Sequence, residues 1–196
     1  MKKEQWYKLI YYITRPFIGV FFPQKNIGRE NIPEGPALIC ANHSSGLDAL
    51  MLPYAMGKGI YLRIMAKHEL KKIPVIGWIL GKAGVVFVRR GERDIDSFKN
   101  SMRALKSGEK LALFPEGTRV RGDDSVAAKT GAVHMAARAG VPIVPVYIPR
   151  EKKIFRPSRI VIGQPYYIKV EARGDFEGHA QELMNRIWAL GEQNHE

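Results

Sequence analysis

The sequence predicts a single α/β domain in which a mixed, mostly parallel sheet is flanked by helices. Three observations lead to this fold class. Short apolar runs of strand character alternate with stretches of helical periodicity along most of the chain. The run at residues 85–88 is continuous and rich in β-branched residues, as in a strand that is buried on both faces. The 196 residues, 45% of them hydrophobic, suffice for one domain with a sizeable core.

Strands and helices are expected to alternate through the chain. The predicted elements are strands at 36–41, 60–66, 85–88, 110–114 and 141–148, and helices at 45–56, 74–80, 95–105 and 129–140. The prolines within 141–148 favour a position at an edge of the sheet or at a bulge. Two short strands, at 160–162 and 166–170, and a helix at 176–192 are expected to close the domain.

Residues 1–24 form a segment of distinct composition. Aromatic and aliphatic residues predominate between positions 6 and 22, but Lys8 and Arg15 interrupt them. The uninterrupted apolar runs are shorter than the ~20 residues that a bilayer-spanning helix needs, and no cleavage site of a secretory signal follows. We therefore expect a helical segment that lies in a membrane interface. The alternative is a helix that packs onto its own domain or onto a partner.

Charge is the unusual feature of the composition. Lysine and arginine number 31 against 19 acidic residues, so the formal net charge is +12. This excess predicts an anionic partner, which can be a nucleic acid, an anionic membrane surface or a phosphorylated substrate. The single cysteine, Cys40, excludes a disulfide within the chain and fits a reducing compartment.

The candidate catalytic stretch is ICANHSSGLDAL at 39–50, where a strand passes into a helix. His43 stands at the carboxyl end of the strand, where open α/β sheets usually place their chemistry. Asp48, five residues on, falls in the first helical turn and can fold back toward the imidazole. An aspartate that accepts from one ring nitrogen leaves the other free to take a proton. On these two residues alone, the alternative is a packed histidine and an acid that faces the helix dipole.

Arginines follow the buried strand at 85–88. Arg89, Arg90 and Arg93 emerge where a ligand crevice would open. Guanidinium groups bind phosphate bidentately and keep their charge at any relevant pH. The alternative is a solvated basic turn that pairs with neighbouring acids.

A second polar loop reads FPEGTR at residues 114–119. Its proline and Gly117 restrict the backbone path, which leaves Glu116, Thr118 and Arg119 to contact a ligand. An ion pair between Glu116 and Arg119 that only holds the loop is the alternative.

Together, NHSSGLD at 42–48 and FPEGTR at 114–119 resemble the glycerolipid acyltransferase family, in particular the bacterial 1-acylglycerol-3-phosphate acyltransferases. Two further blocks resemble the family and occur in its order, GVVFVRR at 84–90 and VPIVPV at 141–146. The resemblance implies the glycerolipid acyltransferase fold. Residues 25–196 are then the catalytic domain and residues 1–24 the membrane-association segment.

The resemblance implies direct acyl transfer. His43, oriented by Asp48, would act as general base on the free hydroxyl of a lysophosphatidic acid, which attacks the thioester of acyl-coenzyme A or acyl carrier protein. Six residues are expected to bind the acceptor: Arg90, Arg93, Glu116, Gly117, Thr118 and Arg119. The family implicates the glutamate and arginine of the second loop in acceptor binding, and the resemblance places Arg90 on the arginine of the family's second block.

The expected partners are a lysophospholipid acceptor, an acyl-thioester donor and an anionic membrane surface at the cytoplasmic face of the cell membrane, without nucleic acid. No metal or other cofactor is expected, because a thioester is already activated and the sequence has no Walker loop, paired CxxC or HExxH motif. Two alternatives remain. One is an acyltransferase of the same superfamily for glycerol 3-phosphate, another lysophospholipid or an aminolipid. The other is a non-enzymatic binder of nucleic acid or anionic membrane.

Overall fold

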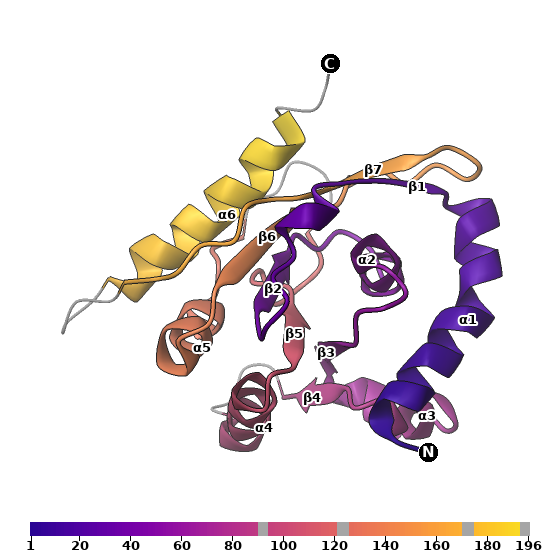
Figure 1. Ribbon diagram of the computed structural model, residues 1–196, viewed down its shortest axis with the longest axis horizontal. Helices are drawn as coiled ribbons and strands as arrows, with labels where there is room; N and C mark the ends of the chain where they lie inside the picture. The colour runs from indigo at the N-terminus through magenta and orange to yellow at the C-terminus, as the bar shows by residue number, and fades with distance from the viewer. Residues whose placement is uncertain (90–93, 121–125, 170–174, 193–196) are drawn as a thin grey trace.

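The computed structural model describes residues 1–89, 94–120, 126–169 and 175–192, and within these ranges seven strands form one sheet with helices on both faces (Figure 1). The strands are β1 (Gln24–Ile27), β2 (Leu38–Ala41), β3 (Leu62–Lys67), β4 (Val86–Val88), β5 (Lys110–Leu113), β6 (Ile143–Tyr147) and β7 (Ser158–Ile162). Their spatial order is β1-β7-β6-β2-β5-β3-β4, and all neighbours are parallel except β6 and β7. The predicted fold class is confirmed.

The helices are α1 (Lys3–Phe21), α2 (Asp48–Met56), α3 (Ile76–Lys82), α4 (Ile95–Lys106), α5 (Gly131–Ala139) and α6 (Phe176–Glu192), with 3-10 turns η1 (Arg29–Asn31) and η2 (His68–Lys72). In Figure 1, α1, α2 and α3 lie on one side of the sheet and α4, α5 and α6 on the other. α2 begins at Asp48, later than the predicted start near position 45. The last predicted strand, 166–170, is represented in the described residues by an isolated bridge between Tyr166 and Ile143.

Two apolar cores form because alternate residues of a strand face opposite sides of the sheet. In β2, Leu38 and Cys40 pack with side chains of α4, α5 and α6, whereas Ile39 and Ala41 pack with side chains of α1 and α2. All four residues are fully buried. Burial on both faces explains why this strand is a continuous apolar run rather than an alternating one.

β6 lies inside the sheet, between β7 and β2, so the expectation of an edge or bulged strand at 141–148 is wrong. β6 pairs with β7 only through residues 146 and 147. Beyond them, the carbonyl of Pro145 accepts a hydrogen bond from the N–H of Gly163 at 2.8 Å. The N–H that Pro145 lacks therefore falls where the ladder to β7 ends, and a central strand tolerates the proline there.

α1 packs on the domain along one side and presents apolar side chains along the other. Tyr7, Tyr11 and Ile18 are buried in the core that α1 shares with α2. The outer face of α1 consists of six large apolar residues that are 37% to 68% exposed: Leu9, Tyr12, Ile13, Phe17, Val20 and Phe21. Among the helices that the structure describes, none has the length and apolar character needed to cross a bilayer. α1 thus packs on its own domain and still leaves an apolar stripe on the surface.

The sheet brings three loops to one edge. β6, β2 and β5 are neighbours and run parallel, so the segments that follow them emerge side by side. The three strands end at Ala41 (β2), Leu113 (β5) and Tyr147 (β6), and the segments follow these residues. In an open α/β sheet this edge is the usual place for a ligand site.

Candidate active site

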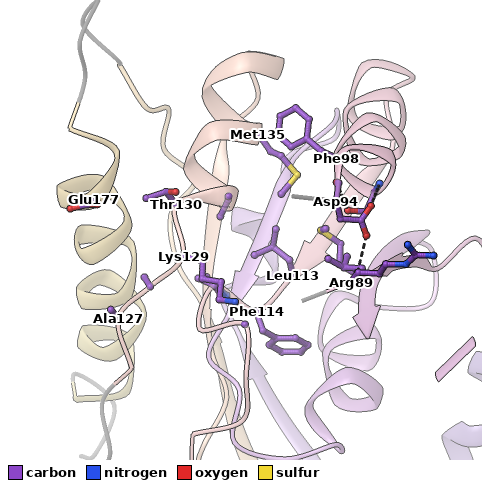
Figure 2. A pocket seen from close by; sticks show the side chains of 18 of the residues that line it. Arg89, Asp94, Phe98, Leu113, Phe114, Ala127, Lys129, Thr130, Met135 and Glu177 are labelled. Carbon is purple, nitrogen blue, oxygen red and sulfur yellow. Dashed lines mark hydrogen bonds between the residues drawn. The ribbon is translucent and has the colours of Figure 1, made fainter. Parts of the chain in front are cut away.

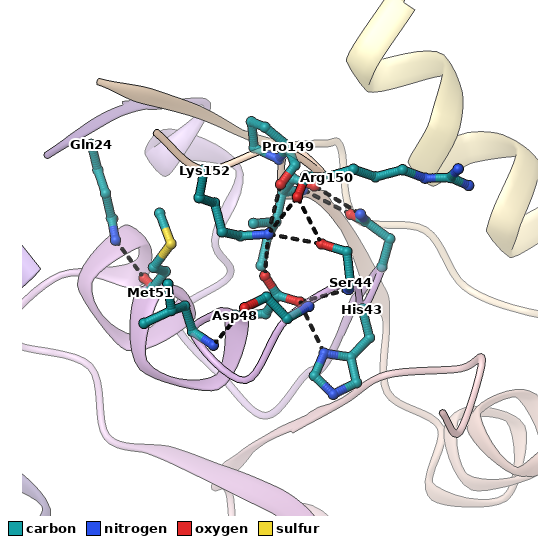
Figure 3. A network of polar contacts seen from close by, with 12 residues as sticks. Gln24, His43, Ser44, Asp48, Met51, Pro149, Arg150 and Lys152 are labelled. Carbon is teal, nitrogen blue, oxygen red and sulfur yellow. Dashed lines mark hydrogen bonds and ion pairs between the residues drawn. The ribbon is translucent and has the colours of Figure 1, made fainter. Parts of the chain in front are cut away.

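The loop after β2 brings His43 and Asp48 into direct contact (Figure 3). Nδ1 of His43 lies 2.9 Å from Oδ2 of Asp48, as the spacing of the two residues predicts. The same carboxylate oxygen accepts hydrogen bonds from the backbone N–H groups of Ser44 at 2.7 Å and Ser45 at 2.8 Å. The side chain of His43 is 9% exposed and that of Asp48 is 0% exposed. The loop is therefore closed around a buried carboxylate.

The surroundings of Asp48 determine which nitrogen of His43 carries the proton. Burial acts to raise the pKa of Asp48, but the hydrogen bond with His43 and the ammonium of Lys152 outweigh it, and the pKa is lowered below its usual value. An ionised Asp48 can only accept, so Nδ1 of His43 is the protonated nitrogen. Nε2 is then left with its lone pair, as a general base requires.

Glu116 and its loop hold the backbone of His43. Oε2 of Glu116 accepts from the N–H of His43 at 2.6 Å, and the N–H of Val120 donates to the carbonyl of His43 at 2.8 Å. Glu116 is only 2% exposed. Burial raises the pKa of Glu116 to about 7, although the N–H of His43 and the nearby Arg150 oppose this shift. Glu116 thus holds the histidine through its backbone N–H. That Glu116 also binds the acceptor stays a prediction.

Gly117 occupies a position that favours glycine. Its φ is 66°, in the left-handed region, and a Cβ there would lie 2.7 Å from Cε of Lys129. Thr118 and Arg119, which follow, are exposed. The guanidinium of Arg119 lies beside Gly46 of the first loop, so it stands at the mouth of the site.

The arginines predicted after β4 are only partly covered by the structure. Arg90 and Arg93 lie outside the described residues. Arg89 is exposed, and its backbone N–H donates to Oδ2 of Asp94 at 2.8 Å. β4 is the last strand in the sheet order, two strands away from β5. The expected contact of Arg90 and Arg93 with phosphate stays a prediction.

Two side chains of the site escaped the sequence analysis. The amide of Asn42 donates to the carbonyl of Ile148 at 2.7 Å and accepts from its N–H at 2.8 Å, which ties the end of β2 to the end of β6. Nζ of Lys152 lies 2.7 Å from Oδ1 of Asp48, and the lysine side chain is 3% exposed. Asn42 is next to His43 in the motif at 42–48, and this position is the signal in the sequence that could have identified it. Lys152 stands in the charged run REKK, which is typical of a solvated loop.

A cavity of about 970 Å³ extends from the carboxyl ends of β3, β4 and β5 between α4, α5 and α6 (Figure 2). Its walls are largely apolar and include Met65, Val88, Phe98, Leu113, Phe114 and Met135. The ring of Phe114 also stacks on the imidazole of His43, with centroids 4.1 Å apart. Phe114 thus lies between the cavity and the imidazole of His43. The described residues that line the cavity include none from 141–148.

Several known proteins are similar to this chain. Residues 25–149 match the sequence model of the family described as Acyltransferase. The chain is 31% identical over 161 residues to the 1-acyl-sn-glycerol-3-phosphate acyltransferase of Saccharomyces cerevisiae, an alignment that covers 79% of this chain and 52% of that protein. It is 34% identical over 131 residues to the protein of the same name from Borreliella burgdorferi, covering 65% and 52%. The chain spans about half the length of these curated relatives.

The fold also has a counterpart among solved structures. The crystal structure of the 1-acyl-sn-glycerophosphate (LPA) acyltransferase PlsC from Thermotoga maritima matches with a TM-score of 0.67 at 20% identity, covering 96% of this chain and 95% of that one. At this identity the match shows a shared fold. The family match spans most of the chain and includes both the loop of His43 and Asp48 and the loop of Glu116. The chain therefore belongs to the Acyltransferase family.

Proposed function

We propose that the protein transfers an acyl chain from an acyl thioester to the free hydroxyl of 1-acylglycerol 3-phosphate, which yields phosphatidic acid. The observation that carries this proposal is the buried pair of His43 and Asp48, which leaves Nε2 available beside a largely apolar cavity. The names of the relatives support the acceptor, and the net charge of +12 fits a phosphorylated lipid.

In the proposed reaction, Nε2 of His43 takes the proton of the acceptor hydroxyl while the hydroxyl oxygen attacks the thioester carbonyl. The tetrahedral intermediate then expels the thiolate as the carbon–sulfur bond breaks, and the thiolate takes the proton back from His43. No acyl-enzyme is formed. Cys40 is buried within β2, where burial raises the pKa of its thiol, so it is a poor nucleophile. Since a thioester is already activated, the reaction needs no cofactor.

The two substrates approach the base from different directions in this proposal. The acyl chain occupies the cavity behind Phe114, where its methylenes are removed from water. The phosphate of the acceptor binds Arg119 at the mouth of the site, because that guanidinium is exposed next to Gly46 in the loop of the base. Arg90 and Arg93 are the further candidates for the phosphate. The donor is acyl-coenzyme A or acyl carrier protein.

We also propose that the protein acts as a peripheral protein on an anionic membrane, at the cytoplasmic face. The outer face of α1 is apolar, and Lys8 and Arg15 are exposed on the same helix. Ile154 and Phe155, 57% and 65% exposed, extend this surface, since the ring of Phe155 lies 5.5 Å from that of Phe21. A lysophospholipid acceptor would reach the enzyme from such a surface.

The first test is thiol release from palmitoyl-coenzyme A and from an acyl-carrier-protein thioester, with and without lysophosphatidic acid, in detergent. We expect release that depends on the acceptor and forms phosphatidic acid. His43→Ala should lower the rate by roughly 10²- to 10⁴-fold, since the general base is lost, while its circular dichroism spectrum stays that of the wild type.

His179→Ala is the matched control, because His179 lies on α6 and pairs with Glu182 of the same helix. This variant should keep the wild-type rate. Near-normal activity of His43→Ala would exclude His43 as the base. If neither thioester releases thiol with lysophosphatidic acid, the acceptor assignment fails, and glycerol 3-phosphate and other lysophospholipids are the next acceptors to assay.

A further inference from the structure

Lys152 is a buried lysine in the segment between β6 and β7, and its ammonium group is fully engaged (Figure 3). Nζ lies 2.7 Å from Oδ1 of Asp48, 2.8 Å from Oγ of Ser44 and 2.7 Å from the carbonyl oxygen of Pro149. Nζ also lies 3.4 Å from the carbonyl oxygen of Arg150, and its contact with Asp48 is an ion pair. Burying a charge is costly unless it is paired and hydrogen-bonded, so this arrangement is a specific one.

The two oxygens of Asp48 have different partners. Oδ2 accepts from Nδ1 of His43 and from the N–H groups of Ser44 and Ser45. Oδ1 faces Lys152. Oδ1 accepts no hydrogen bond from the described residues, so the ion pair with Lys152 is what holds it. Without this ion pair, the carboxylate would gain by turning away from the imidazole toward other donors or water. Lys152 therefore determines the orientation in which Asp48 meets His43.

Other charged or titratable groups lie in the neighbouring loops: Glu116 and Arg119 in the loop after β5, and Arg150 in the segment after β6. Glu116 accepts from the backbone N–H of His43, not from its ring. Among the described side chains, Lys152 is the cation that pairs with Asp48.

We propose that Lys152 is a positioning residue for acyl transfer, which holds the carboxylate of Asp48 aligned with Nδ1 of His43. The proposal rests on the proposed role of His43 as general base. Lys152 lies in the segment between β6 and β7, beyond residue 149, where the match to the family model ends.

The first experiment compares Lys152→Met with Lys153→Met. Methionine keeps most of the length of lysine without the charge. Lys153 is the neighbouring lysine, but it is 53% exposed and pairs only on the surface with Glu151. We expect Lys152→Met to lower kcat by roughly ten- to a hundredfold, because the orientation of the base is lost while the base remains, with KM for lysophosphatidic acid within about twofold of wild type. Lys153→Met should keep both values. Wild-type kcat in Lys152→Met would overturn the proposal.

A double-mutant cycle with Asp48→Asn separates positioning from general support of the fold. If Lys152 acts through Asp48, adding Lys152→Met to Asp48→Asn produces no further loss of kcat. If the lysine acts independently of Asp48, the double variant loses further kcat relative to Asp48→Asn, and the proposal fails. The double variant removes both buried charges together, so this comparison holds even when Lys152→Met alone does not fold.

A readout without turnover distinguishes this proposal from the proposed function. In ¹⁵N NMR, the imidazole of His43 is identified by its absence from His43→Gln. The wild type should show a single tautomer protonated at Nδ1, and Lys152→Met a mixture of the two tautomers. If the wild type forms no phosphatidic acid but the spectra differ in this way, the proposed function fails and the role of Lys152 stands. If the wild type is active and the spectra coincide, the role of Lys152 is refuted.

Discussion

Asp48 and Glu116 are two buried carboxyl groups on opposite sides of His43, and their partners give them opposite pKa shifts. Asp48 meets an imidazole, two backbone N–H groups and an ammonium, and its pKa is lowered. Glu116 has the N–H of His43 as its hydrogen-bond donor, and burial raises its pKa to about 7. Asp48 therefore stabilises the fold above the usual aspartate range, and this contribution is lost as the pH falls through its lowered pKa.

The stability contributed by Glu116 has the opposite pH dependence. Its folded-state pKa is raised, so its contribution is fully present below the unfolded value near 4.5 and is lost as the pH rises through about 7. Glu116→Gln keeps an oxygen that can accept from His43 and removes this titration. We expect the variant to gain in unfolding free energy relative to wild type between pH 4 and pH 8, by up to about 3 kcal/mol.

Urea unfolding across this pH range measures the difference. Glu69→Gln serves as the control, because Glu69 is exposed in η2 and its substitution leaves the pH dependence as in wild type. A difference between Glu116→Gln and wild type that does not vary with pH would contradict the assigned titration.

Among the elements, α4 and α5 form much of the wall of the cavity. α4 contributes Ser97 and Phe98, and α5 contributes Ala132 and Met135. Phe98 and Met135 point into the cavity in Figure 2. Since Phe98 is only partly buried, its side chain can change size with less cost to the fold than a core residue.

Two substitutions at Phe98 test the cavity as the acyl site. Phe98→Trp narrows it and should shift the preference toward shorter acyl donors, whereas Phe98→Ala widens it and should favour longer ones. Loss of contact with two methylenes is worth about 1.6 kcal/mol, so we expect ratios of kcat/KM between donors two carbons apart to change roughly tenfold. A series of acyl-coenzyme A donors measures these ratios. Tyr167→Ala, at an exposed position, is the control, and an unchanged order of donors in both Phe98 variants would exclude this wall from acyl binding.

For the whole molecule, the segment between β6 and β7 connects the site with the surface. Lys152 contacts Asp48, and three residues later the N–H of Phe155 donates to the carbonyl of Phe21 in α1 at 2.9 Å. Phe155 has a φ of 61°, which is unfavourable for a bulky residue, so this contact holds it in place. One short stretch of chain thus joins the apolar surface of α1 to the pair of His43 and Asp48.

Binding to vesicles tests the outer face of α1. The double variant Ile13→Glu/Phe17→Glu replaces two exposed apolar side chains and should weaken binding to vesicles with anionic lipid by roughly tenfold or more. Wild-type binding should also weaken as salt is raised, because charges at the surface are screened. Sedimentation with vesicles provides both measurements.

Tyr167→Glu is the matched control for this experiment, since Tyr167 is 66% exposed and follows the bridge of Tyr166 to the start of β6. It should bind vesicles like the wild type. Equal binding of the α1 double variant and this control would exclude α1 as the membrane contact.

The sequence by itself determined the local structure of the protein. Apolar periodicity located the helices from α3 to α6 to within two residues, because a helix buries one face at regular spacing. The contact of His43 with Asp48 was also predictable, because the two residues are separated by one tight loop and the first turn of α2. Interactions between near neighbours depend on few conformational choices, so residue types and spacing sufficed.

Only the tertiary structure decided what distant segments do to one another. The order β6-β2-β5 places Glu116 and Lys152 on either side of the pair of His43 and Asp48. Along the chain, Glu116 is 73 residues from His43, and Lys152 is 104 residues from Asp48. The same order puts β6 inside the sheet despite its prolines. Strand order depends on how the helices cover both apolar faces of the sheet at once. The sequence of a single segment does not contain this information. Whether a lysine in a charged run is solvated, or is buried and paired with an aspartate, therefore depends on which strands are neighbours in the sheet.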